Sequence, residues 1–416
     1  VNFWRYAFRS LLTEVLLYRH VKSGCCGFMK MRPFSKRSQS IQAFKAMAVL
    51  AKANELAALG LDIIHLEVGQ PDFPVPERIK AAGIAAIDQD HTGYTNANGL
   101  EALRTKISDF YAEAYGLSIA PERVILTSGA SGGLALLMTL LLDPGDGCLI
   151  TNPGYPSNRY FIEAFSGEPQ LIQVGPQSRF QLTGDKVAAA WRQNTAGLLT
   201  ASPSNPTGNS LSPSDLGDIY EVVKRHQGFL ISDEIYQGLE YGPDQRNSAL
   251  HHGDDVFVVN SFSKYFGMTG WRLGWVVAPE NAVESLIRIA QNLFICPSVP
   301  AQYAALAAFE PEVLQLLDEQ RDVLAQRRDY MMECLPEAGL EIPVAPDGAF
   351  YVYARLPEGF PDADTFCDLL LRQTGVAVTP GSDFGDFETN RYVRISYAQE
   401  QSRLEQAVSR IGEFRP

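Results

Sequence analysis

Lys264 stands alone between two apolar runs of the chain. The run 256–259 precedes its segment and the run 273–278 follows it, and both have the pattern of buried strands. On residue type alone, a lone lysine in such a place is most often a solvated loop residue. Lysine is nevertheless rarely buried without a task, and a desolvated amine has a lowered pKa, which makes it a nucleophile toward carbonyl compounds.

Hydroxyl and guanidinium groups surround this lysine in the sequence. Ser261 and Ser263 precede it, and Arg272 follows at the start of the second apolar run. Hydroxyls and an arginine fork are suitable ligands for a phosphate group. The segment 261–272 therefore predicts a lysine that reacts with a carbonyl compound next to an anion site.

A second anion site is predicted where the strand pattern 124–127 passes through small residues into a helix at 134–142. The turn is Ser-Gly-Ala-Ser-Gly-Gly, which matches neither a Walker loop nor G-x-G-x-x-G. Free N–H groups and the dipole of a helix N-terminus favour a bound anion. Glycine-rich turns are common, so the motif is weak by itself; Ala130 and Ser131 are its candidate ligands.

Other polar or aromatic residues follow further strand patterns. Tyr155 lies in Asn-Pro-Gly-Tyr-Pro, Asn205 in Ser-Pro-Ser-Asn-Pro-Thr-Gly, and Asp233 ends the strand 229–232. By type alone, such a tyrosine is more often a core residue, and such an acid is commonly solvated or a helix cap. In open α/β sheets, however, ligands bind at the carboxyl ends of the strands, where all of these residues would meet.

Strand and helix patterns alternate from about residue 76 to 300. This order predicts an α/β fold with a mostly parallel central sheet and helices on both faces, together with a smaller α+β domain. The expected division is a basic N-terminal extension at 1–40, an arm at 41–75, a large domain at 76–310 and a small domain at 311–416. Residues 1–40 carry eight Lys or Arg against one acid, and residues 1–28 are expected to be untranslated or disordered.

Taken in order, these motifs resemble the pyridoxal-phosphate aminotransferases of the aspartate aminotransferase superfamily (fold type I, class I/II). Their S-x-[SA]-K-x-x-G-x-x-G-x-R pattern carries the cofactor lysine, and the resemblance extends over about residues 40–414. It implies that Lys264 binds pyridoxal 5'-phosphate and that Tyr155 stacks on its ring. It also implies that Asp233 pairs with the ring nitrogen, and that Asn205 and Tyr236 bond to the phenolic oxygen.

The same resemblance extends to the substrate and to a partner subunit. Gly69, in Gly-Gln-Pro-Asp-Phe, and Arg394, in Arg-Ile-Ser-Tyr-Ala, are expected to hold the α-carboxylate, with Asn205 beside them. Tyr94 is expected to reach the cofactor phosphate of the neighbouring subunit in a homodimer. Without the resemblance, these residues would be interpreted as an ordinary turn, a solvent-facing strand charge and a surface tyrosine.

The implied activity is transfer of an amino group from an L-amino acid to a 2-oxo acid such as pyruvate or 2-oxoglutarate. Ser131, and Asn292 or Leu293, stand where aspartate-specific relatives place a cation for a second carboxylate. A neutral or broad donor range is therefore favoured over strict aspartate, with Arg159 a surface charge or a substitute cation. A lyase or decarboxylase on the same fold stays open, as does the sensor domain of a transcription regulator.

Composition narrows the class of protein further. The formal net charge of -13 argues against nucleic acid as a partner, and no apolar run reaches the ~20 residues that span a bilayer. The six cysteines show no C-x-x-C spacing, and the six histidines show no metal-ligand spacing. The sequence thus predicts a cytoplasmic enzyme with reduced thiols, no metal and no membrane partner.

Overall fold

The computed structural model describes residues 33–242 and 246–415. The expectation about residues 1–28 lies outside the described residues. The chain divides into two units, residues 1–41 and residues 42–416. In the described part of the first unit, helix α2 (Lys36–Ser40) begins after Ser35, whose hydroxyl accepts the Ser38 N–H as an N-cap.

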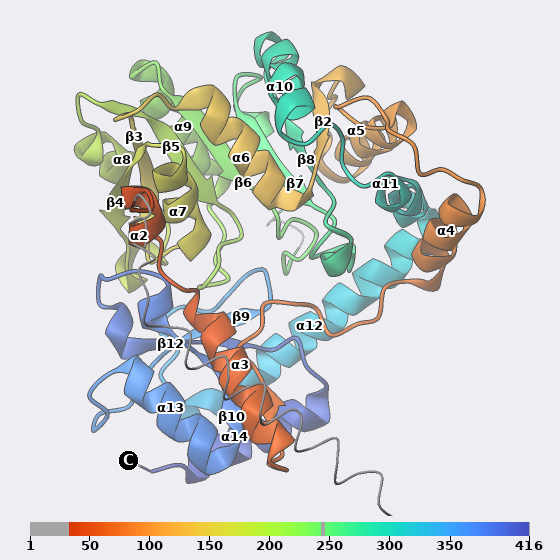
Figure 1. The fold of residues 1–416 in the computed structure, drawn as a ribbon. Coiled ribbons are helices and arrows are strands. Elements are labelled where there is room, and N and C mark those ends of the chain that lie inside the picture. Colours follow the sequence, from red (N-terminus) through yellow and green to blue (C-terminus); the bar gives the residue numbers. More distant parts are fainter. Residues whose placement is uncertain (1–32, 243–245, 416) are drawn as a thin grey trace, which may run out of the picture. The chain divides into compact units, whose positions relative to one another are not determined.

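A seven-stranded sheet forms the centre of the second unit (Figure 1). Neighbouring strands are parallel except at β8, which runs antiparallel to both of its neighbours. In spatial order the strands are β2 (Val124–Thr127), β8 (Gly274–Val277), β7 (Phe257–Ser261), β6 (Phe229–Asp233), β5 (Thr195–Ala201), β3 (Gly147–Asn152) and β4 (Glu168–Gln173). The predicted α/β fold with a mostly parallel sheet is confirmed.

Helices cover both faces of this sheet, because successive strand residues point into two separate hydrophobic cores. In β2, Leu126 belongs to one core and Ile125 to the other. The first core includes side chains of α5 (Glu101–Tyr115) and α9 (Pro213–Arg225). The second includes side chains of α6 (Gly129–Leu141), α7 (Pro156–Ala164) and α10 (Glu280–Leu293). Further helices of this part are α4 (Glu77–Asp88), α8 (Gly184–Ala190) and α11 (Val299–Leu306).

A smaller part of the second unit is built on short strands. β12 (Tyr392–Ser396) pairs antiparallel with β9 (Tyr351–Arg355) and β11 (Thr379–Pro380), and β1 (Ile64–His65) pairs in parallel with β10 (Val376–Ala377). The helices here are α3 (Lys45–Ala58), α12 (Pro311–Glu337), α13 (Ala363–Thr374) and α14 (Gln401–Glu413). The segment that contains α3 and β1 therefore folds with the C-terminal part, and α12 runs from beside α4 to the small sheet (Figure 1).

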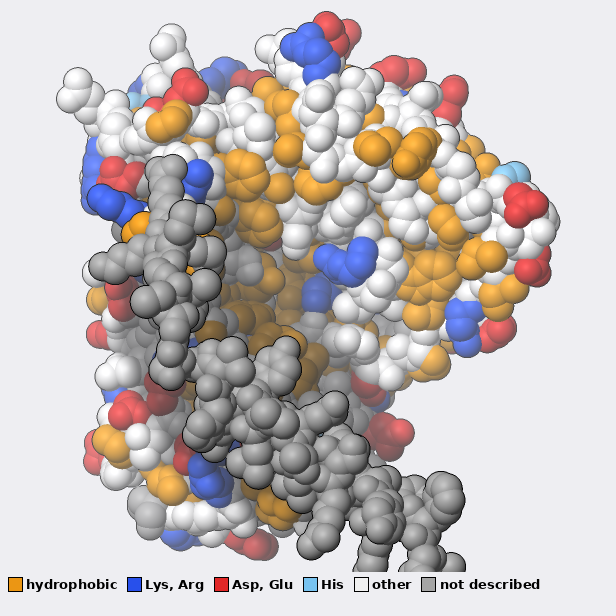
Figure 2. Space-filling view, viewed as in Figure 1, with side chains coloured by type: hydrophobic (Ala, Val, Ile, Leu, Met, Phe, Trp, Pro, Cys, Tyr) orange, Lys and Arg blue, Asp and Glu red, His pale blue; other side chains and the backbone are white. Residues whose placement is uncertain are grey.

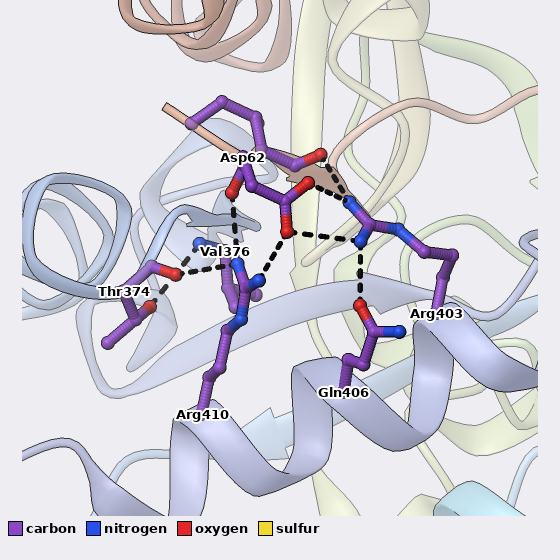
Figure 3. A network of polar contacts seen from close by, with 7 residues as sticks. Asp62, Thr374, Val376, Arg403, Gln406 and Arg410 are labelled. Atoms are coloured by element: carbon purple, nitrogen blue, oxygen red, sulfur yellow. Dashed lines mark hydrogen bonds and ion pairs between the residues drawn. The ribbon is translucent and has the colours of Figure 1, made fainter. Parts of the chain in front are cut away.

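Asp62 ties the start of this β1 segment to the C-terminal helices (Figure 3). Its carboxylate accepts from Arg403 Nη2 at 2.8 Å and also bonds to Arg410. Arg410 Nη1 reaches the carbonyl oxygens of Asp62 and Thr374, each at 2.9 Å. The two guanidinium groups lower the pKa of Asp62 to about 2, so the Asp62 carboxylate stays ionised at mildly acidic pH.

Candidate functional site

A cavity of about 280 Å³ lies at the carboxyl ends of the large-sheet strands, next to the small sheet. Figure 2 shows a hollow lined by hydrophobic side chains on this face, with Lys or Arg side chains beside it. Every residue predicted for the site lines this cavity except Ser261 and Tyr94. Those that do are Gly69, Ala130, Ser131, Tyr155, Asn205, Asp233, Tyr236, Ser263, Lys264, Arg272 and Arg394.

Lys264 extends into the cavity from the turn that follows β7. Its Nζ donates a 2.5 Å hydrogen bond to the carbonyl oxygen of Gly69 and lies 5.6 Å from the centre of the Tyr236 ring. Burial, followed by the positive charges of Arg394 and Arg272, lowers the pKa of Lys264 to about 8. A substantial share of this amine is therefore neutral, and thus nucleophilic, close to physiological pH.

Asp233 is the last residue of β6 and is 5% exposed. Burial raises its pKa to about 6, while the N–H of Ile235, donated at 3.2 Å, and the charge of Lys264 work in the opposite direction. The carboxylate is ionised at neutral pH but poorly solvated. A cationic or N–H donor group placed in the cavity would therefore be stabilised by it.

The start of α6 has features that are suited to an anion. Ser128 at its N-cap makes no side-chain cap bond, so the N–H groups of the first turn lack that partner, and Ala130 and Ser131 of this turn line the cavity. Gly129 has φ +70°, and a Cβ there would meet Arg272 Nη2 at 2.6 Å. Only glycine allows the guanidinium this close to the helix end. The helix dipole and Arg272 thus act on the same small space.

The two serines near Lys264 lie at different depths. Ser263 lines the cavity, and its hydroxyl accepts from Arg272 Nη1 at 3.4 Å. Ser261 is 1% exposed and lies behind it, where its hydroxyl accepts the N–H of Ser263 at 3.1 Å and contacts the Ser263 hydroxyl at 2.9 Å. Ser263 thus lies at the cavity wall beside Arg272, and Ser261 supports it from behind.

Arg394 is buried, at 2% exposure, although it alternates with apolar residues as a surface strand charge would. Its Nη1 donates to Asn205 Oδ1 at 3.0 Å, and its Nη2 donates to the carbonyl oxygen of Glu67 and, at 3.3 Å, to Thr379 Oγ1. Its Nε has no partner among the described residues. A guanidinium held this way at a cavity wall is suited to a carboxylate ligand.

Two tyrosines meet beside this arginine. The hydroxyls of Tyr236 and Tyr351 are hydrogen-bonded at 2.8 Å, and the Tyr351 ring lies 4.5 Å from the Arg394 guanidinium carbon. Burial, followed by the neighbouring Tyr351, raises the pKa of Tyr236 well above its usual value. Tyr236 therefore keeps its proton and can donate it in a hydrogen bond to a ligand.

Tyr155 and Tyr94 differ in position. Tyr155 forms part of the cavity wall, and the Phe44 ring packs edge-on against it at 6.2 Å between centroids. Tyr94 is 82% exposed and lies outside this cavity, in a surface depression together with His91 and Tyr303. The single chain does not bring Tyr94 to the other site residues.

The cavity also contains residues that the sequence does not indicate. Phe44 and Met47 reach it from the segment before β1, and the carboxylate of Asp383 accepts the N–H groups of Lys45 and Ala46 at 2.9 and 3.2 Å. The remaining ones are Ala46, Glu67, Val68, Gln70, Leu134, Ala201, Pro203, Ile235, Thr269 and Tyr351. Most are apolar residues inside ordinary helix or strand patterns, which give no signal of a ligand site.

The part of the chain that the structure describes lacks two other kinds of feature. Residues 33–242 and 246–415 contain no group of three or more His, Cys, Asp or Glu side chains suited to a metal ion. Among the same residues, no helix is both long and apolar enough to cross a membrane.

Comparison with known proteins places the chain in a family. Residues 61–411 match the family described as aminotransferase class I and II. The chain is 37% identical over 377 residues to the valine–pyruvate aminotransferase of Mycobacterium tuberculosis, covering 90% of this chain and 97% of that protein.

Solved structures agree with this match. A crystal structure of an aminotransferase from Mycobacterium tuberculosis superposes with a TM-score of 0.88 at 37% identity, covering 92% of this chain and 98% of that one. The aspartate aminotransferase of Thermus thermophilus with maleate gives a TM-score of 0.87 at 32% identity, covering 92% and 100%. The chain therefore belongs to the class I and II aminotransferases, enzymes that move an amino group between an amino acid and a 2-oxo acid.

Proposed function

We propose that this aminotransferase uses pyridoxal 5'-phosphate bound through Lys264. The cavity fits such a group in three places. The start of α6 with Ser263 and Arg272 suits the phosphate, because the Cβ that would fill this space is absent at Gly129. The buried Asp233 suits a protonated ring nitrogen, and the depressed pKa of Lys264 suits an amine that bonds to a carbonyl carbon.

When bound, the cofactor supplies an electron sink that stabilises negative charge at the Cα of the amino acid. The residues of the chain do the remaining work. Arg394 holds the α-carboxylate, Asn205 fixes its guanidinium, and Gly69 lines the same cavity. Lys264 Nζ, once the amino acid has displaced it from the cofactor, would act as the base that takes the proton from Cα. Asp233 is ionised at neutral pH and would accept a hydrogen bond from the protonated ring nitrogen, which keeps its proton.

We further propose that the donor is a neutral amino acid, such as alanine or a branched or aromatic one, with pyruvate or 2-oxoglutarate as acceptor. The cations among the described lining residues are Lys264, Arg272 and Arg394, and each already has a role. Arg159 does not line this cavity and pairs with Glu163 at 3.0 Å. The named relatives include both a valine–pyruvate and an aspartate aminotransferase, so donor choice must be measured.

The proposed assembly is a homodimer in the cytoplasm. The 82% exposure of Tyr94, outside the cavity of its own chain, is what a residue reaching a partner would show. The four described cysteines are free thiols, in keeping with a reducing compartment. Mixing a Tyr94→Ala subunit with a Lys264→Ala subunit tests the dimer, because the mixed dimer contains one intact site. Activity that reappears on mixing supports shared sites, and no recovery after verified subunit exchange contradicts them.

The experiment that tests the whole proposal is the visible absorbance of the purified protein. A visible band that requires Lys264, disappears with particular amino acids and returns with a 2-oxo acid supports transamination and identifies the donor. Valine, alanine and phenylalanine should remove the visible band more readily than aspartate does. A band that no donor changes reversibly would overturn the proposal. The relatives named above give no support to a lyase or to a transcription regulator.

A further inference from the structure

We propose that Tyr351 is a positioning residue that orients Tyr236 through its hydroxyl and Arg394 through its ring. The inference rests on the proposed cofactor chemistry. Tyr351 comes from β9 of the small sheet, whereas Tyr236 follows β6 of the large sheet. Tyr351 therefore joins the cofactor half of the cavity to the half that holds the substrate carboxylate.

The Tyr351 hydroxyl is the buried partner of the Tyr236 hydroxyl. Tyr351 is 0% exposed and Tyr236 is 4% exposed, so each hydroxyl depends on the other as a buried partner at 2.8 Å. If Tyr236 donates its proton to the phenolic oxygen of the cofactor, its own oxygen is left to accept one from Tyr351. A donor that also accepts a hydrogen bond is a stronger donor, because the two bonds polarise each other.

The ring of Tyr351 contacts the guanidinium of Arg394. On the paired strands β9 and β12, Tyr351 is opposite Ser396 and Arg394 is opposite Tyr353, so Tyr351 and Arg394 are diagonal neighbours on one face of the sheet. The guanidinium carbon lies 4.5 Å from the ring centre, close enough for a cation–π contact in a buried setting. The ring thus limits the rotation of the guanidinium that is to receive a carboxylate.

Gly69 shows how tightly this tyrosine is fitted. A Cβ on Gly69 would lie 2.3 Å from the Tyr351 hydroxyl oxygen, so the turn that accepts the Lys264 bond packs directly on that hydroxyl. One side chain therefore contacts Tyr236, Arg394 and the Gly69 turn. It carries no charge and lies in an apolar strand pattern, which explains why the sequence does not single it out.

Tyr351→Phe and Tyr351→Leu separate the two contacts. In the holoenzyme, Tyr351→Phe should move the pH midpoint of the visible band upward by about 0.3 of a unit or more. The shift is upward because a weaker donor at the phenolic oxygen stabilises the more negative, high-pH form less. The Michaelis constant for the preferred donor should stay within about twofold of the wild-type value, because the ring remains.

Tyr351→Leu removes the ring as well, and should raise that Michaelis constant a further 3- to 10-fold, on the order of one lost cation–π contact. Tyr353→Phe is the matched control, since it removes another buried β9 hydroxyl, one that does not line the cavity. An unshifted midpoint in Tyr351→Phe would overturn the hydroxyl role, even if Tyr351→Leu failed to fold. Equal Michaelis constants in folded Phe and Leu variants would overturn the ring role. A wild-type protein without the visible band would instead count against the proposed function.

Discussion

Arg394 Nη1 and Asn205 Oδ1 form a 3.0 Å hydrogen bond that joins β12 of the small sheet to the loop after β5 of the large one. Both side chains are buried at the cavity wall. The bond makes the proposed carboxylate-binding group dependent on both parts of the fold, because each supplies one of the two partners.

Replacing Arg394 by lysine should raise the Michaelis constants for the amino acid and for the 2-oxo acid by about 10- to 100-fold. A lysine offers no planar fork, and the lost charge-assisted bond is worth ~1.5–3 kcal/mol. Steady-state kinetics with both substrates measure the effect. The control is Arg355→Lys, since Arg355 ends β9 and is exposed to solvent. Similar constants in the two variants would show that Arg394 does not receive the carboxylate.

Replacing Lys264 by methionine should stabilise the cofactor-free protein at pH 7 by up to ~3 kcal/mol. The pKa of Lys264 is about 8 in the folded protein, against 10.5 for the unperturbed side chain. Below pH 8 the folded protein bears the cost of a buried charge. As pH rises from 8 to 10.5, that cost disappears, since only the unfolded state still binds the proton.

Urea unfolding of both proteins at pH 7 and at pH 10 measures this difference. At pH 10 the unfolding free energy of the wild-type protein should rise relative to that of the methionine variant. An equal difference in unfolding free energy between the two proteins at pH 7 and at pH 10 would mean that Lys264 is not desolvated in the folded chain.

Arg327 and Asp72 should couple α12 to the Gly69 turn. Arg327 Nη1 bonds both carboxylate oxygens of Asp72, at 2.8 and 3.0 Å, and Arg327 is 7% exposed. Arg327→Met should cost ~1.5–3 kcal/mol of unfolding free energy, because the charge-assisted hydrogen bonds to Asp72 are lost. The Arg327→Met/Asp72→Asn double variant should recover part of that loss. A double variant as unstable as the sum of both single ones would show that the pair does not interact.

Ser261→Ala should weaken cofactor binding although Ser261 does not line the cavity. It removes the acceptor of the Ser263 N–H and leaves that buried donor unpaired, a loss of ~1–3 kcal/mol. Titration of the cofactor-free protein with pyridoxal 5'-phosphate, followed by absorbance, measures the affinity. Ser108→Ala, which removes a buried hydroxyl within α5, should leave the affinity unchanged. An unaltered affinity in Ser261→Ala would mean that Ser263 needs no such support.

The sequence could predict the parts of the fold that leave a periodic or motif signal. The alternation of apolar runs with helical segments indicated the α/β sheet, and the candidates that follow those runs, such as Asn205 and Asp233, do meet in one cavity. The edge strand β4 (Glu-Pro-Gln-Leu-Ile-Gln) was not predicted, because an edge strand needs no continuous apolar run. Strand direction was equally hidden: β8 has the same apolar pattern as its parallel neighbours, yet runs antiparallel.

The residue pattern around Arg394 also could not predict that this charged side chain is buried. Arg394 has the spacing of a surface residue, and only its partners Asn205, Glu67 and Thr379, distant along the chain, show why it can be buried. The sequence gives no functional signal at Tyr351 either, because an aromatic residue is ordinary in an apolar strand. Its importance depends on what it contacts.

Phe44 and Met47 belong to a segment that precedes every strand of the described fold. Protease trimming or a poorly placed affinity tag in that segment would leave the sheets untouched and still alter one wall of the cavity. Such material would keep most of its circular dichroism signal while showing a changed ranking of amino acid donors. Quality control for this enzyme should therefore include a selectivity assay as well as a melting curve.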